Sequence, residues 1–201
     1  MTGQDLFIIA PELSMVGLAM LLLVFDLITN RRDILVTVVG MGLLIPAGFI
    51  LALWLSVEST GAVGNQGILS ESVIVDKFSL FFKGLLIVII GLVFLISYHH
   101  IKRTLWLQVE YYVLLLFSVA GMMLLTSAVE FVTIYVSLEL TALPVAALAA
   151  FRRDSRSSES AFKFLILSGV SSALLLYGMV LVYGFTGSTF LEDIALRLQQ
   201  L

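Results

Sequence analysis

Six long apolar stretches follow one another along the chain, each bounded by charged or turn-forming residues. Each is long enough to cross a hydrocarbon layer about 30 Å thick, which takes about 20 helical residues. The stretches are apolar on all sides and do not alternate, so they indicate helices rather than the strands of a membrane barrel. The pattern predicts an all-α integral membrane protein that forms one membrane domain over residues 1–201. The predicted helices are 7–29, 34–57, 76–98, 109–127, 129–151 and 160–185.

Two polar segments interrupt or follow these stretches. Residues 58–72 contain three glycines and no basic residue, which is typical of a loop outside the bilayer. The tail 190–201 is too short to cross, but it places Phe190, Ile194 and Leu198 at four-residue spacing. This spacing predicts a short amphipathic helix at the membrane surface.

Composition excludes several classes of protein. Of the 201 residues, 60% are hydrophobic and 12% charged, and the mean hydropathy is +1.11, so an ordinary soluble domain is excluded. The net charge of -3 and the short basic clusters give no indication of nucleic-acid binding. Cysteine is absent, which excludes disulfides and Cys-held metal centres, and we predict no metal site. Before Arg31 there is no Lys or Arg, so the first helix is expected to remain in the mature protein.

Basic residues predict the orientation in the membrane. They follow the first, third and fifth apolar stretches, while the connections between them hold none. By the positive-inside rule, both ends of the chain are expected to face outside. The clusters expected to face the cytoplasm are Arg31–Arg32, Lys102–Arg103 and Arg152 to Arg156.

Glu139 is the most informative charged residue, because the fifth apolar stretch places it near the bilayer midplane. A carboxylate there costs about 2.5–3.5 kcal/mol on insertion scales, so it is expected to face protein or water. That position suits a group that takes up and releases protons, although a structural hydrogen bond between helices is the alternative. Pro144, five residues further on, is expected to kink the helix and to free a carbonyl.

Three other charged positions have less certain roles. Lys163 lies a few residues inside the sixth stretch, where it can either snorkel to the interface or take part in proton transfer. Lys83 is expected to pair with Asp76 or to reach the outer interface. Glu12 lies near the end of the first stretch, where a capping or interfacial role is the default.

Several segments together form a pattern typical of one family. They are Pro11-Glu12, Asp76 to Lys83, Glu110-Tyr-Tyr, Gly121-Met-Met, Leu138-Glu-Leu, Pro144, Ala150 to Lys163 and Leu176-Tyr-Gly-Met. In these segments the chain resembles subunit N of the proton-pumping NADH:quinone oxidoreductases, complex I. The family is related to cation/proton antiporter subunits and carries a mid-helix glutamate and a lysine on the next helix. The resemblance implies that Glu139 and Lys163 are its proton-transfer residues.

The resemblance also implies a function and partners. The chain is expected to be a membrane subunit in which proton translocation is coupled to quinone reduction, in the bacterial plasma membrane and with other complex I membrane subunits as partners. No cofactor is expected in this chain; quinone, NAD, FMN and iron–sulfur clusters are expected in partner subunits. Family members are more than twice this length, so the chain is expected to hold the N-terminal part of an antiporter-like fold. A subunit of a separate cation/proton antiporter and a membrane scaffold remain as alternatives.

Overall fold

The computed structural model describes residues 3–28, 35–60, 72–104, 108–152 and 154–199. Within them all long elements are helices, and six stretches are long and apolar enough to cross a membrane. The predicted all-α membrane fold with about six spans is therefore confirmed. The helices are α1 (Gly3–Ile8), α2 (Ala10–Ile28), α3 (Leu35–Gly42), α4 (Leu44–Thr60), α5 (Lys77–Thr104), α6 (Gln108–Leu125), α7 (Phe131–Ala149), α8 (Ser155–Thr186) and α9 (Leu191–Leu198).

Prolines explain why two apolar stretches each form two helices. The helix breaks at Ile9, two residues before Pro11, and again at Leu43, three residues before Pro46. Proline has no amide hydrogen, so the carbonyl four residues earlier receives no helical hydrogen bond. The chain stays in line through both breaks, since Leu13 donates to the carbonyl of Ile9 and Ala47 to that of Leu43.

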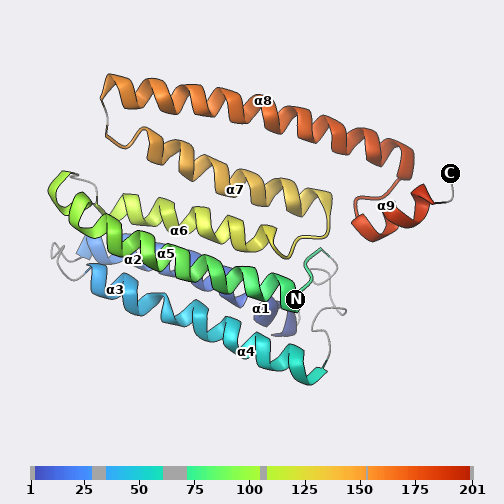
Figure 1. The fold of residues 1–201 in the computed structure, drawn as a ribbon, viewed down its shortest axis with the longest axis horizontal. Coiled ribbons are helices and arrows are strands. Elements are labelled where there is room, and N and C mark those ends of the chain that lie inside the picture. The colour runs from blue at the N-terminus through green and yellow to red at the C-terminus, as the bar shows by residue number, and fades with distance from the viewer. Residues whose placement is uncertain (1–2, 29–34, 61–71, 105–107, 153, 200–201) are drawn as a thin grey trace.

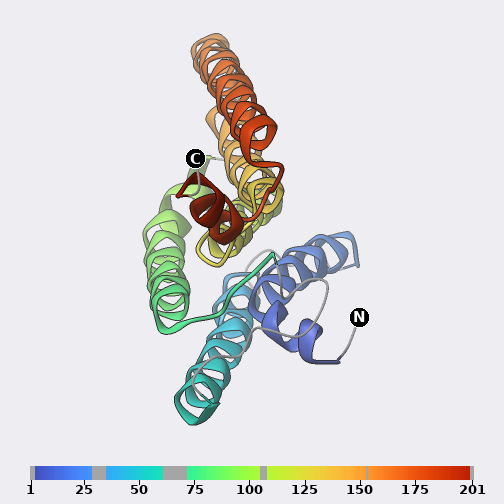
Figure 2. The ribbon, with the colours of Figure 1, turned by 90° about the vertical axis from the view of Figure 1, so that its right-hand side faces the viewer.

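The long helices lie side by side, and α6 is at the centre of the arrangement (Figures 1 and 2). It packs against α2 and α5 on one side and α7 on the other, while α8 lies at the edge and contacts α7. A continuous hydrophobic core runs through α2, α4, α5 and α6. In α8, by contrast, Ala161 and Thr186 are the buried residues.

Polar caps set the ends of α5 and α8. The Asp76 carboxylate accepts a hydrogen bond from the backbone amide of Ser79 at 2.7 Å, at the start of α5. Asp154 accepts one from the amide of Ser157 at 2.6 Å, at the start of α8. At its other end α8 stops at Gly187, whose φ of 66° is the left-handed conformation that glycine adopts most easily.

Backbone hydrogen bonds join three connections at one end of the bundle. Ile74 donates to the carbonyl of Ser127, and Phe131 donates to that of Thr189. The carboxylate of Glu130 adds two side-chain bonds, from Thr133 at 3.2 Å and from Thr189 at 3.1 Å. The segment before α5, the α6–α7 connection and the α8–α9 connection are thereby held together.

Several features predicted from the sequence lie wholly or partly outside the residues that the structure describes. Helix α4 extends to Thr60, so the predicted loop begins later than expected, and residues 61–71 lie outside the described part. The Arg31–Arg32 cluster also lies outside it. The side chains of Lys102 and Arg103 are not described, although both residues belong to α5.

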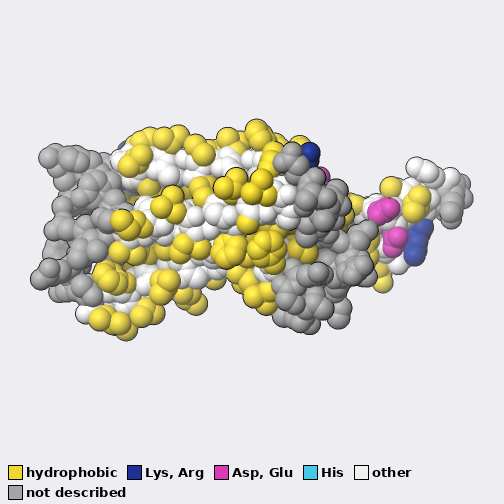
Figure 3. All heavy atoms as spheres, turned by 90° about the horizontal axis from the view of Figure 1, so that it is seen from below, with side chains coloured by type: hydrophobic (Ala, Val, Ile, Leu, Met, Phe, Trp, Pro, Cys, Tyr) yellow, Lys and Arg dark blue, Asp and Glu magenta, His cyan; other side chains and the backbone are white. Residues whose placement is uncertain are grey.

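The surface agrees with a membrane environment. The face in Figure 3 is mainly hydrophobic along the helices, and its visible charged side chains lie towards one end. Large apolar side chains are exposed on α2, α4, α5 and α8, among them Leu27, Leu51, Leu95 and Leu167. Contiguous exposed apolar surface on this scale indicates contact with lipid or with other membrane helices.

Candidate functional site

Glu139 lies close to the middle of α7. It is half-buried, and at 1.5 Å per residue it lies about 12 Å along the axis from Phe131 and about 15 Å from Ala149. Val132 and Tyr135 precede it by seven and four residues, so they share its helix face. This face is turned towards α8, because both residues line a cavity of about 260 Å³ together with Val180 and Tyr183 of α8.

The opposite face of α7 carries a row of hydroxyls. Ser137 donates to the carbonyl of Thr133 at 2.6 Å, and Thr141 donates to that of Ser137 at 2.9 Å. From α6, Ser118 donates to the carbonyl of Thr141 at 3.2 Å. Residues 137 and 141 are each two positions from Glu139, which is about 200° around the helix. The Ser118 hydroxyl therefore links α6 to α7, the other two bonds lie within α7, and Glu139 points away from that interface.

Gly121 allows the close approach of α6 to α7. A Cβ atom at this position would lie 2.8 Å from the backbone nitrogen of Thr141 and 2.9 Å from the carbonyl carbon of Leu140. Only a residue without a side chain fits there unless the helices move apart. Helix α6 therefore lies very close to α7 at Leu140 and Thr141, next to Glu139 in the sequence.

Pro144 is buried in the interior of α7, and the helix continues beyond it to Ala149. Because proline lacks an amide hydrogen, the carbonyl of Leu140 has no helical donor. The Leu140 carbonyl, which lacks this usual donor, is one residue from Glu139 in the sequence. The proline does not end the helix; the predicted kink stays a prediction.

Lys163 pairs with an acid on its own helix. Its Nζ atom lies 2.5 Å from Oε1 of Glu159, one turn earlier on α8, and the two side chains are 72% and 63% exposed. Val180 and Leu176 line the cavity beside Tyr135, so the part of α8 opposite Glu139 is near residues 172–176. Lys163 is about 14–20 Å from there along the helix axis. The structure thus places Glu139 and Lys163 on adjacent helices without a direct contact.

The structure contains a charged pair that the sequence analysis did not find. Nζ of Lys83 on α5 lies 2.7 Å from Oε1 of Glu12 on α2, and the side chains are 0% and 7% exposed. Both expectations for Lys83 are wrong: it neither pairs with Asp76 nor reaches the interface. Asp76 is occupied instead as the cap of α5. The default role expected for Glu12, a cap or interfacial partner, is wrong as well, because Glu12 is buried.

Helical spacing was the available signal for this pair. On α5, Lys83 falls in a buried row that recurs every three or four residues, and Glu12 falls in a similar row on α2. The rows are Leu80, Lys83, Ile87, Ile90 and Phe94 on α5, and Glu12, Met15, Ala19 and Leu22 on α2. A lysine in such a row points to the core, where only another helix can supply its counter-ion.

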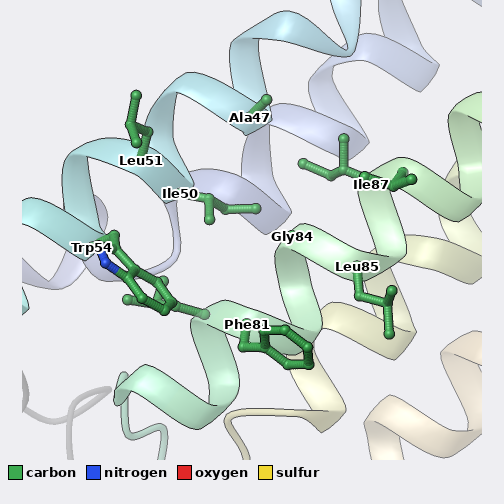
Figure 4. A pocket seen from close by; sticks show the side chains of 10 residues that line it. Ala47, Ile50, Leu51, Trp54, Phe81, Gly84, Leu85 and Ile87 are labelled. Carbon is green, nitrogen blue, oxygen red and sulfur yellow. The ribbon is translucent and has the colours of Figure 1, made fainter.

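A second cavity lies between α4 and α5 (Figure 4). Its volume is about 520 Å³, and residues of these two helices line it, including Ile50, Trp54, Phe81 and Leu85. The lining is almost entirely apolar, so the cavity suits a hydrocarbon chain rather than a polar substrate. Among the residues that the structure describes, no three His, Cys, Asp or Glu side chains are grouped as metal ligands.

The chain is similar to known membrane proteins. Residues 128–201, which include α7, α8 and α9, match the family described as NADH:quinone oxidoreductase/Mrp antiporter, TM. This portion is therefore similar to the membrane domain of that family. Across almost its whole length the chain is similar to NADH-quinone oxidoreductase subunit N: it is 34% identical to that of Dehalococcoides mccartyi over 98% of the chain, and 38% identical to that of Thioalkalivibrio sulfidiphilus over 95%.

The resemblance to subunit N is thereby confirmed. The chain spans only about two fifths of these relatives, 39% of each. Two solved structures share the fold. Respiratory complex I from Thermus thermophilus matches with a TM-score of 0.69 and 24% identity over 90% of this chain and 38% of that one. The archaeal membrane-bound sulfane sulfur reductase matches with a TM-score of 0.71 and 20% identity over 96% and 39%.

Proposed function

We propose that this chain is a membrane subunit of a respiratory NADH:quinone oxidoreductase and takes part in proton translocation coupled to quinone reduction. The observation that carries the proposal is the position of Glu139, a carboxylate in the middle of a membrane-spanning helix. The similarity to subunit N over nearly the whole chain supports the identity of the complex. Other membrane subunits of that complex are the proposed partners, and the quinone, NAD, FMN and iron–sulfur clusters are proposed to lie in partner subunits.

The proposed chemistry of Glu139 is reversible proton uptake. Burying a carboxylate at the midplane favours its neutral form, while contact with water or a cation favours its charged form. A group balanced between these forms can take a proton from one side and release it to the other. The carbonyl of Leu140, which lacks its usual helical donor because of Pro144, is proposed to bind water on this path.

Lys163 is proposed as the second proton-transfer residue, coupled to Glu139 through water. Its contact with Glu159 keeps the ammonium near the end of α8 where the chain enters the bilayer. Because the two groups are separated along the helices, the coupling requires intervening water or polar side chains. Pro144 would help by keeping the Leu140 carbonyl available to that water.

Proton pumping per electron in membranes that contain the assembled complex tests the role of Glu139. Glu139→Gln is expected to lower this ratio while electron transfer and assembly continue, because the amide cannot carry the proton. The matched control is Glu192→Gln, which changes an exposed acid on α9. A normal ratio in Glu139→Gln would leave the residue with a structural role and favour a membrane scaffold.

A cation/proton antiporter subunit is the second candidate, because the matching family includes Mrp antiporters by its description. Such a subunit would be driven by an ion gradient and would have no redox partners. Purification of the native assembly separates the candidates. Flavin and iron–sulfur subunits in the assembly support the oxidoreductase, and their absence, together with cation-dependent proton exchange, would support the antiporter.

We propose that the chain lies in a bacterial plasma membrane with both ends outside. Single cysteines at Ser158 and Glu192 test this orientation, since both positions are exposed and the chain has no native cysteine. A membrane-impermeant thiol reagent is expected to label Glu192→Cys from outside and Ser158→Cys only after the membrane is opened. Labelling of both from the same side would contradict the orientation.

A further inference from the structure

The buried pair of Glu12 and Lys83 has no role in the function proposed above. The pair lies on α2 and α5, and most of the other buried residues of these two helices are apolar. Lys83 is six residues, or about 9 Å, from the start of α5, which is close enough for a lysine to reach the interface. Its side chain points inward instead and is 0% exposed.

Stability alone does not explain such a pair. Removing two charges from water costs several kcal/mol for each ion, and well-packed apolar residues in their place are often equally or more stable. An ionisable residue inside a membrane domain is for this reason a candidate functional group. Helices α2 and α5 already have apolar rows through which they pack with the other helices, so they do not need the charges for contact.

The pair also has hydrogen-bonding capacity to spare. An ammonium has three donors and a carboxylate about four acceptor sites. In the described part of the chain, Nζ of Lys83 and both carboxylate oxygens of Glu12 are buried without a hydrogen bond of acceptable angle, either to each other or to another residue. The 2.7 Å contact is therefore an ion pair whose outer donors and acceptors are suited to bind water.

The pair stands apart from the other described charges on these helices. On the helices packed around it, the other ionisable groups with described side chains include Asp26 on α2, Lys77 on α5 and Glu110 on α6. None of these forms an ion pair with Glu12 or Lys83. Among the residues that the structure describes, Glu12 and Lys83 are therefore ionic partners of each other alone.

We propose that Glu12 and Lys83 form a second proton-transfer site, which binds water and passes a proton between its two members; this rests on the proposed function in proton translocation. In the transfer step the Nζ–H bond of Lys83 breaks and an O–H bond forms on Glu12, which leaves both groups neutral. The net charge of the core does not change, so the step avoids the cost of burying an extra charge. Glu12 then releases this proton to water, and Lys83 takes up one proton from water.

The test uses the assembled complex in membranes and measures protons pumped per electron. In the variant Glu12→Leu with Lys83→Met, both charges are removed and none is stranded. We expect this variant to assemble and transfer electrons but to lose part of the pumping ratio. The charge swap, Glu12→Lys with Lys83→Glu, keeps a pair and is expected to retain more of it. Lys77→Met, which changes an exposed lysine on the same helix, is the matched control.

A normal ratio in the apolar double variant overturns the proposal. If Glu139→Gln lowers the ratio in the same preparation, only the second site falls, whereas normal ratios in both would also remove the proposed function. If the apolar variant does not assemble, the variant Glu12→Gln with Lys83→Gln takes its place. If neither double variant assembles, the pair has a structural role and the proposal is overturned. Infrared difference spectra during turnover give a separate readout. A protonated-carboxyl band that Glu12→Gln removes supports the proposal, and an unchanged spectrum contradicts it.

Discussion

In two regions of the molecule, a lysine of a membrane helix has opposite environments. In the bundle of α2, α4, α5 and α6, Lys83 is 0% exposed and paired with Glu12 of another helix. On α8, Lys163 is 72% exposed and paired with Glu159 of its own helix. The two helices are similarly apolar as membrane spans. Neighbouring helices, and not the composition of the span, therefore decide whether a charge is buried.

The same contrast holds for apolar side chains. Those of the bundle form a continuous core, whereas α8 exposes residues such as Phe162, Leu167 and Leu174. Lipid or further membrane helices must cover them in the native setting. The bundle is therefore stabilised to a large extent by contacts among its own helices.

Lys83→Met is expected to have the largest effect on stability. It leaves the Glu12 carboxylate buried without its counter-ion, and breaking a buried pair in this way costs about 3–5 kcal/mol. Adding Glu12→Leu removes the stranded charge and should recover most of the loss. Reversible unfolding of the purified chain by SDS in mixed micelles measures both changes. Equal stability of the single and double variants would contradict the buried pair.

Gly121→Ala is expected to have the next largest effect. Its Cβ atom would lie within 2.9 Å of backbone atoms of α7, so the α6–α7 interface must open, at a cost of about 1–3 kcal/mol. Gly91→Ala on α5 is the matched control, because a Cβ atom added there would meet no neighbouring side chain or helix within 4 Å. Alanine stabilises a helix over glycine by up to about 1 kcal/mol, so the two variants should differ in sign. Equal effects in the same unfolding measurement would show that the helices are not in close contact there.

Much of the fold was predictable from the sequence, because in lipid a chain must satisfy its backbone hydrogen bonds within each span. Hydropathy alone was therefore enough to predict the six spans. The breaks at Ile9 and Leu43 were not predicted, although Pro11 and Pro46 were visible as their cause. A proline inside a span can either kink the helix or divide it, and packing decides between these outcomes.

The charged sites were less predictable, because the two residues of a charged pair can lie far apart in the sequence. The contact between Lys163 and Glu159 follows from i, i+4 spacing and needed no structure. The partner of Lys83 lies on α2, far earlier in the sequence, and only the packing of the helices brings the two residues together. The position of Glu139 in mid-helix agrees with the structure, while its coupling to Lys163 remains a prediction.

Lys163→Met is expected to have the smallest effect on stability and thus gives the sharpest contrast with Lys83→Met. An exposed i, i+4 pair contributes about 0.2–1 kcal/mol, so the chain should unfold at almost the same SDS fraction as the unchanged protein. Proton pumping per electron in the assembled complex should nevertheless fall, because the proposed role of Lys163 is in proton transfer. Glu159→Gln breaks the same ion pair but keeps the lysine, and should therefore match Lys163→Met in stability while retaining more of the pumping. A stability loss as large as that of Lys83→Met would mean that α8 is buried by its own chain, and normal pumping in Lys163→Met would mean that the lysine only reaches the interface.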